Sequence, residues 1–260
     1  MDIFHLQYNE ISIFIFMLIR TGVILFMMPF FSSRVIPVPV KAGLALVITL
    51  VLFPAERSNV ESVPGTLWEM AGMVAGELFV GMILGILVHV FFEGIHMMGQ
   101  LAGVETGFSI ANVIDPQSGS QTSVLANMAY LISLVLFLIL NGHHIIINAI
   151  RESFAIIQPG TVSLNRQVFE EMLKRSGDIF IIAVKIGAPV IAAILFIQVA
   201  FGLITRLIPQ MNIMIVAFPL QIGVGLLFFG ISLNGMERFM ERYLGSLGGM
   251  LTNMMMLMKG

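Results

Sequence analysis

Long apolar runs separated by short polar segments dominate the chain. Runs of membrane length or close to it cover residues 11–31, 40–55, 67–92, 124–140, 179–205 and 213–233. A bilayer core of ~30 Å needs ~20 apolar residues when they form a helix. The pattern therefore predicts an all-α integral membrane protein. Residues 1–10 contain no Lys or Arg, so we expect the first run to stay in the mature chain.

Several of these runs contain residues that fit poorly in lipid. Pro37, Pro39 and Pro54 bracket the second run, and Pro189 and Pro219 lie inside the last two. Charged residues also lie within apolar runs, namely Arg20, Glu69, Glu77 and Lys185. A charge at mid-membrane costs at least ~2.5 kcal/mol, so such groups should face protein or water. We therefore expect kinked long helices and helical hairpins that pack inside an assembly.

Basic residues are absent between positions 58 and 150, although six carboxylates lie there: Glu61, Glu69, Glu77, Glu93, Glu105 and Asp115. We expect these groups to sit in water, to be protonated, or to meet cations of another subunit. If all six runs cross the membrane, eight basic residues share one side with both termini. Three lie opposite, namely Arg34, Lys41 and Arg206. The positive-inside rule then puts both termini in the cytoplasm.

Glycines recur at helical spacing between residues 69 and 106, which could form one helix ~57 Å long. On a helical wheel Gly72, Gly76 and Gly94 share one sector, and the opposite sector holds Gly81, Gly85, Gly99 and Gly103. Small residues let helix backbones approach closely in lipid. We interpret this helix as one with a neighbour on each side, and its helix-packing interface as Gly72, Gly76, Gly81, Gly85, Gly99 and Gly103. The alternative is that glycine is simply common in membrane helices.

Two more polar segments have apolar residues at helical spacing. In residues 161–178 these are Val168, Phe169, Met172 and Leu173, and near the C-terminus they are Met236, Phe239, Met240, Tyr243, Leu244 and Leu247. Each pattern predicts an amphipathic helix lying at the membrane interface. For the C-terminal segment, docking of a cytosolic partner is the alternative.

Composition narrows the possible functions. The 260 residues are 58% hydrophobic and 11% charged, with a net charge of −2 and no cysteine. Without a clustered basic face we expect no nucleic-acid partner. No G-x-S-x-G, H-E-x-x-H or phosphate-loop motif occurs. Adjacent His143 and His144 point ~100° apart on a helix, which favours a hydrogen-bonded pair over a metal site. We therefore predict no enzyme, no cofactor and no metal.

One stretch, GFSIANVIDPQSGSQ at residues 107–121, has the Gly, Ser, Asn, Asp and Pro of a loop. By itself it favours a surface loop between helices. Three stretches together, however, resemble one family: GFSIANVIDPQSGSQTSVLA at 107–126, NGHH at 141–144, and RLIPQMNIMIVAFPLQIGVGL at 206–226. They are similar, in order and spacing, to the FliR family of type III secretion export-gate proteins.

The resemblance implies a non-enzymatic subunit of the flagellar type III protein export gate, in the bacterial inner membrane at the flagellar basal body. Its partners would be FliP-type and FliQ-type subunits in a spiral pore assembly, and an FlhB-type protein. Its cargo would be exported flagellar proteins.

The resemblance also implies an internal organisation within a single membrane-embedded helical unit, 1–260. Residues 1–178 would be FliP-like, with a pore loop near 107–122. Residues 179–260 would form a FliQ-like helical hairpin plus a C-terminal amphipathic helix. The implied pore plug is Gly107, Phe108, Ser109, Ile110, Ala111, Asn112, Val113, Asp115 and Pro116. The implied hairpin tip is Arg206, Pro209, Gln210 and Asn212.

Two other functions remain open. A secondary transporter would have helices broken at Pro189 and Pro219 and bind a small substrate at the midplane. It would be favoured by three polar residues inside apolar runs, Lys185, Gln198 and Gln221. A purely structural assembly factor would differ from a gate subunit only in whether its loop touches cargo.

Overall fold

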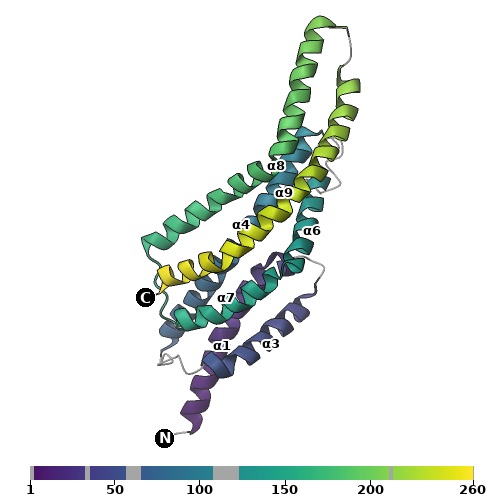
Figure 1. Cartoon of the computed structure of the whole chain (residues 1–260). Coiled ribbons are helices and arrows are strands. Elements are labelled where there is room, and N and C mark those ends of the chain that lie inside the picture. Colours follow the sequence, from purple (N-terminus) through teal and green to yellow (C-terminus); the bar gives the residue numbers. More distant parts are fainter. Residues whose placement is uncertain (1–2, 33–35, 57–65, 108–122, 211–212, 260) are drawn as a thin grey trace. The chain divides into compact units, whose positions relative to one another are not determined.

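The computed structural model of the chain describes residues 3–32, 36–56, 66–107, 123–210 and 213–259 (Figure 1). The described residues form helices α1 (Ile3–Met27), α2 (Pro29–Ser32), α3 (Val38–Glu56), α4 (Leu67–Glu105), α6 (Val124–Ile139), α7 (Gly142–Ile156), α8 (Arg166–Leu207) and α9 (Ile213–Met258). Within this part of the chain the only β-structure is an isolated bridge between Val162 and Lys259.

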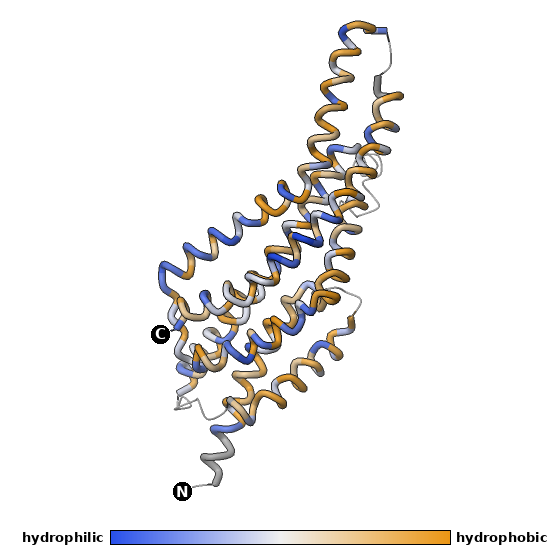
Figure 2. The backbone as a smooth tube through the Cα atoms, viewed as in Figure 1, coloured by the Kyte–Doolittle hydropathy of each residue, from blue (hydrophilic) through white to orange (hydrophobic). Residues whose placement is uncertain are grey.

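Five of these helices contain stretches long and apolar enough to cross a membrane: Asn9–Met27, Val38–Ala55, Leu67–Glu105, Arg166–Leu207 and Ile215–Met258. The pair α6 and α7 is a sixth candidate if a broken span is counted. Hydrophobic residues accordingly predominate along most of the chain (Figure 2). The prediction of an all-α integral membrane protein is confirmed.

The chain folds into two compact units that share its long helices. Unit 1 comprises Met1–Val90, Asn141–Ser176 and Leu244–Gly260, and unit 2 comprises Phe91–Leu140 and Gly177–Tyr243. The boundaries fall inside α4, between α6 and α7, inside α8 and inside α9. The predicted division into a FliP-like part (1–178) and a FliQ-like part (179–260) is a different one, because it rests on likeness to other proteins. It stays a prediction.

In unit 1, α1 packs closely on the first half of α4 because α4 presents glycines there. A Cβ atom built on Gly81 would lie 2.8 Å from Cβ of Val23, and one built on Gly85 would lie 2.6 Å from Cβ of Met27. Side chains at these positions would therefore collide with α1. One turn further on, the ring of His89 hydrogen-bonds to the carbonyl oxygen of Met27 at 3.1 Å.

The last part of α9 completes unit 1. Asn165 joins two helix ends, because its Oδ1 accepts a hydrogen bond from the N–H of Val168 at 3.0 Å and its Nδ2 donates to the carbonyl of Leu257 at 2.9 Å. The first contact caps α8 and the second satisfies a free carbonyl of α9. Met254 and Met255 are buried beside them, as expected of flexible gap-filling side chains.

This arrangement corrects the prediction of a C-terminal helix lying on the membrane surface. Met236, Met240, Leu244 and Leu247 are all buried within the chain. Within unit 2, the rings of Phe239 and Tyr243 stack on Phe91 with centroid distances of 6.2 and 4.5 Å. An amphipathic pattern fits a protein core as well as it fits a membrane interface.

The segment 166–178 also differs from its prediction. It is the beginning of α8 and not a separate helix, and its predicted apolar stripe is divided. Val168 is buried, whereas Phe169 and Leu173 are exposed.

Unit 2 is built from the second half of α4, α6, and most of α8 and α9. A Cβ atom on Gly94 of α4 would lie 2.7 Å from Cβ of Ile182 on α8, and a Cβ atom on Gly99 would collide with the backbone of Ala126 on α6. The ring of Phe92 contacts the rings of Tyr130 and Phe137 edge to face.

The two faces of α4 therefore meet neighbours that belong to the same chain. Gly81 and Gly85 contact α1, Gly99 contacts α6, and Gly76 contacts Val162, while Gly72 faces open space. Gly103 is buried. That other subunits also pack against these glycines stays a prediction.

We predict that Gly85→Leu destabilises the isolated chain, because the new side chain must displace Met27 from α1. Overpacking of this kind costs ~1–3 kcal/mol. The measurement is thermal unfolding of the purified protein in mild detergent. Gly72→Leu is the matched control, since Gly72 has no atom within 4 Å of its Cβ position. Equal midpoints for the two variants would contradict the α1–α4 packing, and loss of partner co-purification should follow the same order.

Candidate functional site

The most distinctive polar group in unit 1 is a buried ion pair between α1 and α4. The side chains of Arg20 and Glu77 are 0% and 1% exposed. Arg20 Nε donates to Oε2 of Glu77 at 2.5 Å, and its Nη2 donates to Oε1 at 3.0 Å. Two parallel hydrogen bonds of this type are the strongest arrangement that a guanidinium and a carboxylate can make.

The same guanidinium also binds the end of α7. Its Nη1 donates to the carbonyl oxygens of Ser153 at 2.7 Å and Ile157 at 2.9 Å. These carbonyls belong to the C-terminal end of the helix, where the helix dipole is negative and a cation is favoured. Arg20 Cζ also lies 4.6 Å from the ring centroid of Phe154, within the range of a cation–π contact.

One side chain thus fastens α1, α4 and α7 together. A buried ion pair contributes little net stability compared with apolar residues of the same size, but breaking it by removing one partner is costly. The cluster has no reactive group exposed to a substrate. We therefore interpret it as a structural centre of unit 1.

This cluster corrects the expectation for one of the carboxylates of residues 58–150, that of Glu77. Glu77 meets a cation of its own chain, 57 positions earlier in the sequence. Glu105 accepts a hydrogen bond from Nε2 of Gln198 at 3.1 Å. A signal was present in the sequence, because Arg20 and Glu77 are opposite charges inside apolar runs and each needs a partner there.

Only the beginning of the predicted pore plug lies in the described part of the chain. Gly107 has φ 82°, in the left-handed region that favours glycine, and lies two residues after the end of α4. The other predicted residues lie outside the described residues: Phe108, Ser109, Ile110, Ala111, Asn112, Val113, Asp115 and Pro116.

The predicted hairpin tip is described in part. Arg206 lies in the last turn of α8, and Pro209 and Gln210 form a turn after it. All three are exposed. Asn212 lies outside the described residues.

The histidines of NGHH lie in the first turn of α7, after its N-cap residue Asn141, which has φ 57°. The two rings have centroids 4.3 Å apart. Nδ1 of His143 is buried and has no hydrogen-bond partner among the described residues, so the expected pair is not fully satisfied. In this part of the chain no group of three or more His, Asp or Glu side chains is placed to hold a metal ion.

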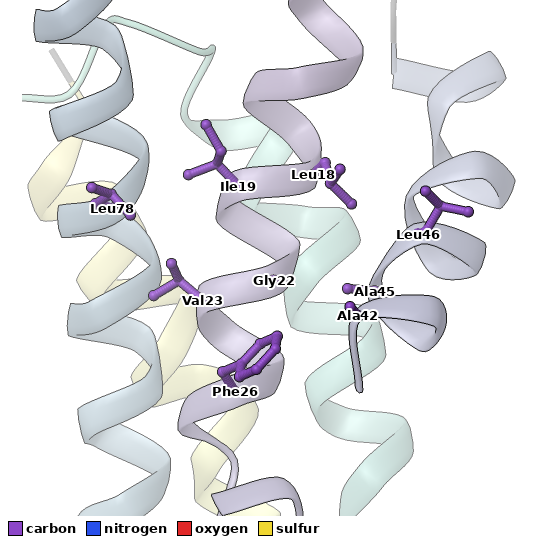
Figure 3. A pocket seen from close by; sticks show the side chains of 9 residues that line it. All are labelled: Leu18, Ile19, Gly22, Val23, Phe26, Ala42, Ala45, Leu46 and Leu78. Atoms are coloured by element: carbon purple, nitrogen blue, oxygen red, sulfur yellow. The ribbon is translucent and has the colours of Figure 1, made fainter. Parts of the chain in front are cut away.

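A groove of about 480 Å³ crosses the surface of α1 in unit 1. Figure 3 shows the side chains of α1 between Leu78 of α4 on one side and those of α3 on the other. The α3 residues are Ala42, Ala45 and Leu46. Because every lining residue is apolar, the groove offers nothing to orient a polar substrate.

Comparison with known proteins agrees with this membrane fold. The family described as "Bacterial export proteins, family 1" matches residues 11–247. The chain is 29% identical to flagellar biosynthetic protein FliR of Escherichia coli over 216 residues, 83% of this chain and 82% of that protein. The identity to the Bacillus subtilis FliR is 30% over 216 residues, 81% and 82% of the two chains. The Pectobacterium carotovorum FliR is 28% identical over 236 residues, 90% and 88%.

The helical membrane fold and the match to the family model together define an α-helical membrane protein of a bacterial export system. The chain belongs to the bacterial export proteins, family 1, and the resemblance to flagellar biosynthetic protein FliR is confirmed. It is a membrane component of the flagellar export apparatus.

We predict that Arg20→Met strongly destabilises unit 1, because it leaves the carboxylate of Glu77 and the carbonyl of Ile157 buried without their donor. Loss of one partner from a buried ion pair typically costs ~3–5 kcal/mol. The measurement is the thermal unfolding midpoint in detergent, together with the rate of limited proteolysis.

Two further variants test whether loss of the ion pair is the cause of the destabilisation. The double variant Arg20→Met with Glu77→Met should recover part of the loss, since neither charge is then buried alone. Arg166→Met should change little, because Arg166 is 91% exposed in its pair with Glu170. A double variant as unstable as Arg20→Met would argue against the ion pair as the origin of the effect.

Proposed function

We propose that the chain is a non-enzymatic subunit of the flagellar type III protein export gate that forms and plugs the secretion pore. Its partners are FliP-type and FliQ-type subunits and an FlhB-type protein, and its cargo is exported flagellar proteins. Its location is the inner membrane at the flagellar basal body. Membership of the export family over residues 11–247 is the observation that carries this proposal.

The length and exposure of the helices support an assembly. At ~1.5 Å per residue, the 42 residues of α8 and the 46 of α9 have contour lengths of roughly 63 and 69 Å, twice a bilayer core. The candidate span of α3 is only 17% buried within the chain. Its exposed side chains include Val47, Leu50 and Val51. Such helices gain most by packing on other subunits.

The end of α4, from which the predicted plug begins, is packed against other helices of unit 2. Thr106 is fully buried, and a Cβ atom built on Gly225 of α9 would collide with its side chain. Beside it, Gln198 of α8 hydrogen-bonds to Glu105. The end of α4 is therefore held by both arms of the hairpin within unit 2. A loop that leaves from this point would have a base packed against both arms of the hairpin, as a plug requires.

The plug makes a direct prediction. Replacing Phe108 and Ile110 with Ser should raise the leakage of ions and small solutes through the assembled gate, because the apolar stopper is removed. The measurement is conductance, or the uptake of a small dye, in cells that produce the complete gate.

Assembly is followed in the same cells by co-purification of the partner subunits. Leu173→Ser, at an exposed apolar residue of α8, is the control and should leave leakage unchanged. Unchanged leakage through a fully assembled Phe108→Ser, Ile110→Ser gate would reject the plug and leave gate membership intact.

The transporter alternative has no support in the described residues. Pro189 and Pro219 lie inside the continuous helices α8 and α9, so neither helix is broken there. Lys185 and Gln198 are exposed, Gln221 is half-buried, and none of the three lines the apolar groove of unit 1.

A further inference from the structure

The middle of α9, within unit 2, carries a short run of charged side chains. We call it the charged strip, and all four of its members are exposed: Glu237, Arg238, Glu241 and Arg242. The side of these turns that holds Met236 and Met240 is buried. Figure 2 shows this part of α9 as hydrophilic and the half of the helix before it as predominantly hydrophobic. The charged strip therefore lies on the outside of unit 2.

Equal charges in the charged strip are four residues apart. Glu237 and Glu241 form one ridge of the helix, and Arg238 and Arg242 form the next. Like charges at this spacing repel each other and weaken a helix. Moreover, neither Glu237 nor Arg242 has an opposite charge three or four residues away on α9. The order of charges in the strip therefore works against the helix that carries it.

The four charges also have no partner on the other described segments. No hydrogen bond or ion pair joins any member of the charged strip to another described residue. Even Arg238 and Glu241, which are three residues apart and opposite in charge, form no ion pair. The whole countercharge of the strip must therefore come from outside the described part of the chain.

The beginning of α8, in unit 1, shows the opposite arrangement. There the charges four residues apart are unlike, Arg166 with Glu170 and Glu171 with Arg175, and both ion pairs are formed at 2.7 Å. Such an order of charges is typical of a helix face that needs only water. Arg166 and Glu170 are indeed 91% and 58% exposed. The charged strip of α9 lacks this self-sufficient order, so solvation alone does not account for it.

The two ridges leave a seat for a second helix between them. At ~100° per residue, Asn234 lies between the ridge of Glu237 and Glu241 and the ridge of Arg238 and Arg242. Asn234 is exposed. A helix placed over this line would have one ridge on each side of it, as charged residues flank the contact line of a coiled coil. A Cβ atom built on the neighbouring Gly235 would meet nothing within 4 Å, so a second backbone has room there.

The presence of both signs distinguishes a protein partner from a lipid surface. Anionic phospholipid headgroups would be attracted by Arg238 and Arg242 but repelled by Glu237 and Glu241 beside them. A protein helix can present acidic residues to one ridge and basic residues to the other. The strip therefore fits a helix of mixed charge.

We propose that the charged strip binds a helix of another subunit that carries two acidic residues four positions apart beside two basic residues with the same spacing. The acidic pair meets Arg238 and Arg242, and the basic pair meets Glu237 and Glu241. A wrong register or a wrong partner would place like charges together, so the strip also selects its partner. This inference rests on the proposed function, because the export gate supplies the neighbouring subunit, but it does not depend on the plug.

Charge reversal tests the strip in the assembled complex. The full chain is tagged and co-produced with the FliP-type, FliQ-type and FlhB-type subunits of its own organism, and the retained subunits are measured at increasing salt. We expect Arg238→Glu with Arg242→Glu to lower retention at least ~fivefold, because the acidic pair of the partner then meets only carboxylates. The control Arg151→Glu with Lys259→Glu reverses two exposed charges of unit 1 and should leave retention unchanged.

Arg242→Gln separates binding from folding. In the isolated chain its thermal unfolding midpoint in detergent should be unchanged or higher, because repulsion from Arg238 is lost and no contact within the chain is broken. The same variant should retain less of the partner subunit. A lower midpoint would contradict a side chain that is unpaired within the chain, and full retention at high salt would contradict its role in binding.

Cross-linking identifies the partner helix. The photoreactive residue p-benzoylphenylalanine, in place of Asn234, should link to a helical segment of one co-produced subunit that carries the two charged pairs. Reversing the acidic pair of that segment to Lys should restore binding to the Arg238→Glu, Arg242→Glu chain. A link to lipid, to the chain itself or to a segment without these charges would overturn the proposal. Full retention of the subunits by the reversed chain would reject the strip alone, whereas failure of the unaltered chain to retain any of them would reject the proposed function as well.

Discussion

Unit 1 depends on one guanidinium that is removed from water. Arg20 satisfies the carboxylate of Glu77 and two carbonyls at the end of α7, and no apolar side chain could replace all of these contacts. Its role is best understood together with the glycines beside it. Arg20, Val23 and Met27 of α1 face Glu77, Gly81 and Gly85 of α4 on successive turns. The glycines permit a close approach only where they face Val23 and Met27. The ion pair adds a second requirement to the same register, which is how buried polar groups specify structure in other helical systems.

The helices of unit 2 are held together differently, by contacts of aromatic rings and glycines. Phe91 and Phe92 lie side by side on α4 and serve different neighbours, α9 for the first and α6 for the second. Gly225 lets the end of α4 approach α9 at Thr106. These contacts bind α4, α6 and α9 without any buried ion pair among the described residues of this unit. Charged groups are left for the outside, where Lys185 and Arg206 lie.

The helices were largely predictable from the sequence, because apolar runs and glycine spacing are local signals. The helix expected between residues 69 and 106 is α4, Leu67–Glu105. Partners distant in the sequence were not predictable in this way. The pairing of Arg20 with Glu77 needs the fold, and the burial of Met236 and Met240 cannot be read from an amphipathic pattern that suits lipid equally well. The plug residues after Gly107 remain a prediction drawn from family resemblance.

The division of the chain between its two units has a consequence for biosynthesis. Unit 1 contains Met1–Val90 but also needs Leu244–Gly260, and unit 2 is interrupted by Asn141–Ser176. Neither unit can close while the ribosome is still making the middle of the polypeptide. During translation the early helices stay incompletely packed until segments more than 150 residues later in the chain have been synthesised. Contacts of such long range form slowly and leave sticky surfaces open meanwhile. A nascent chain of this design therefore has good reason to rely on insertion factors, or on companions already present in the bilayer, until its last turns arrive.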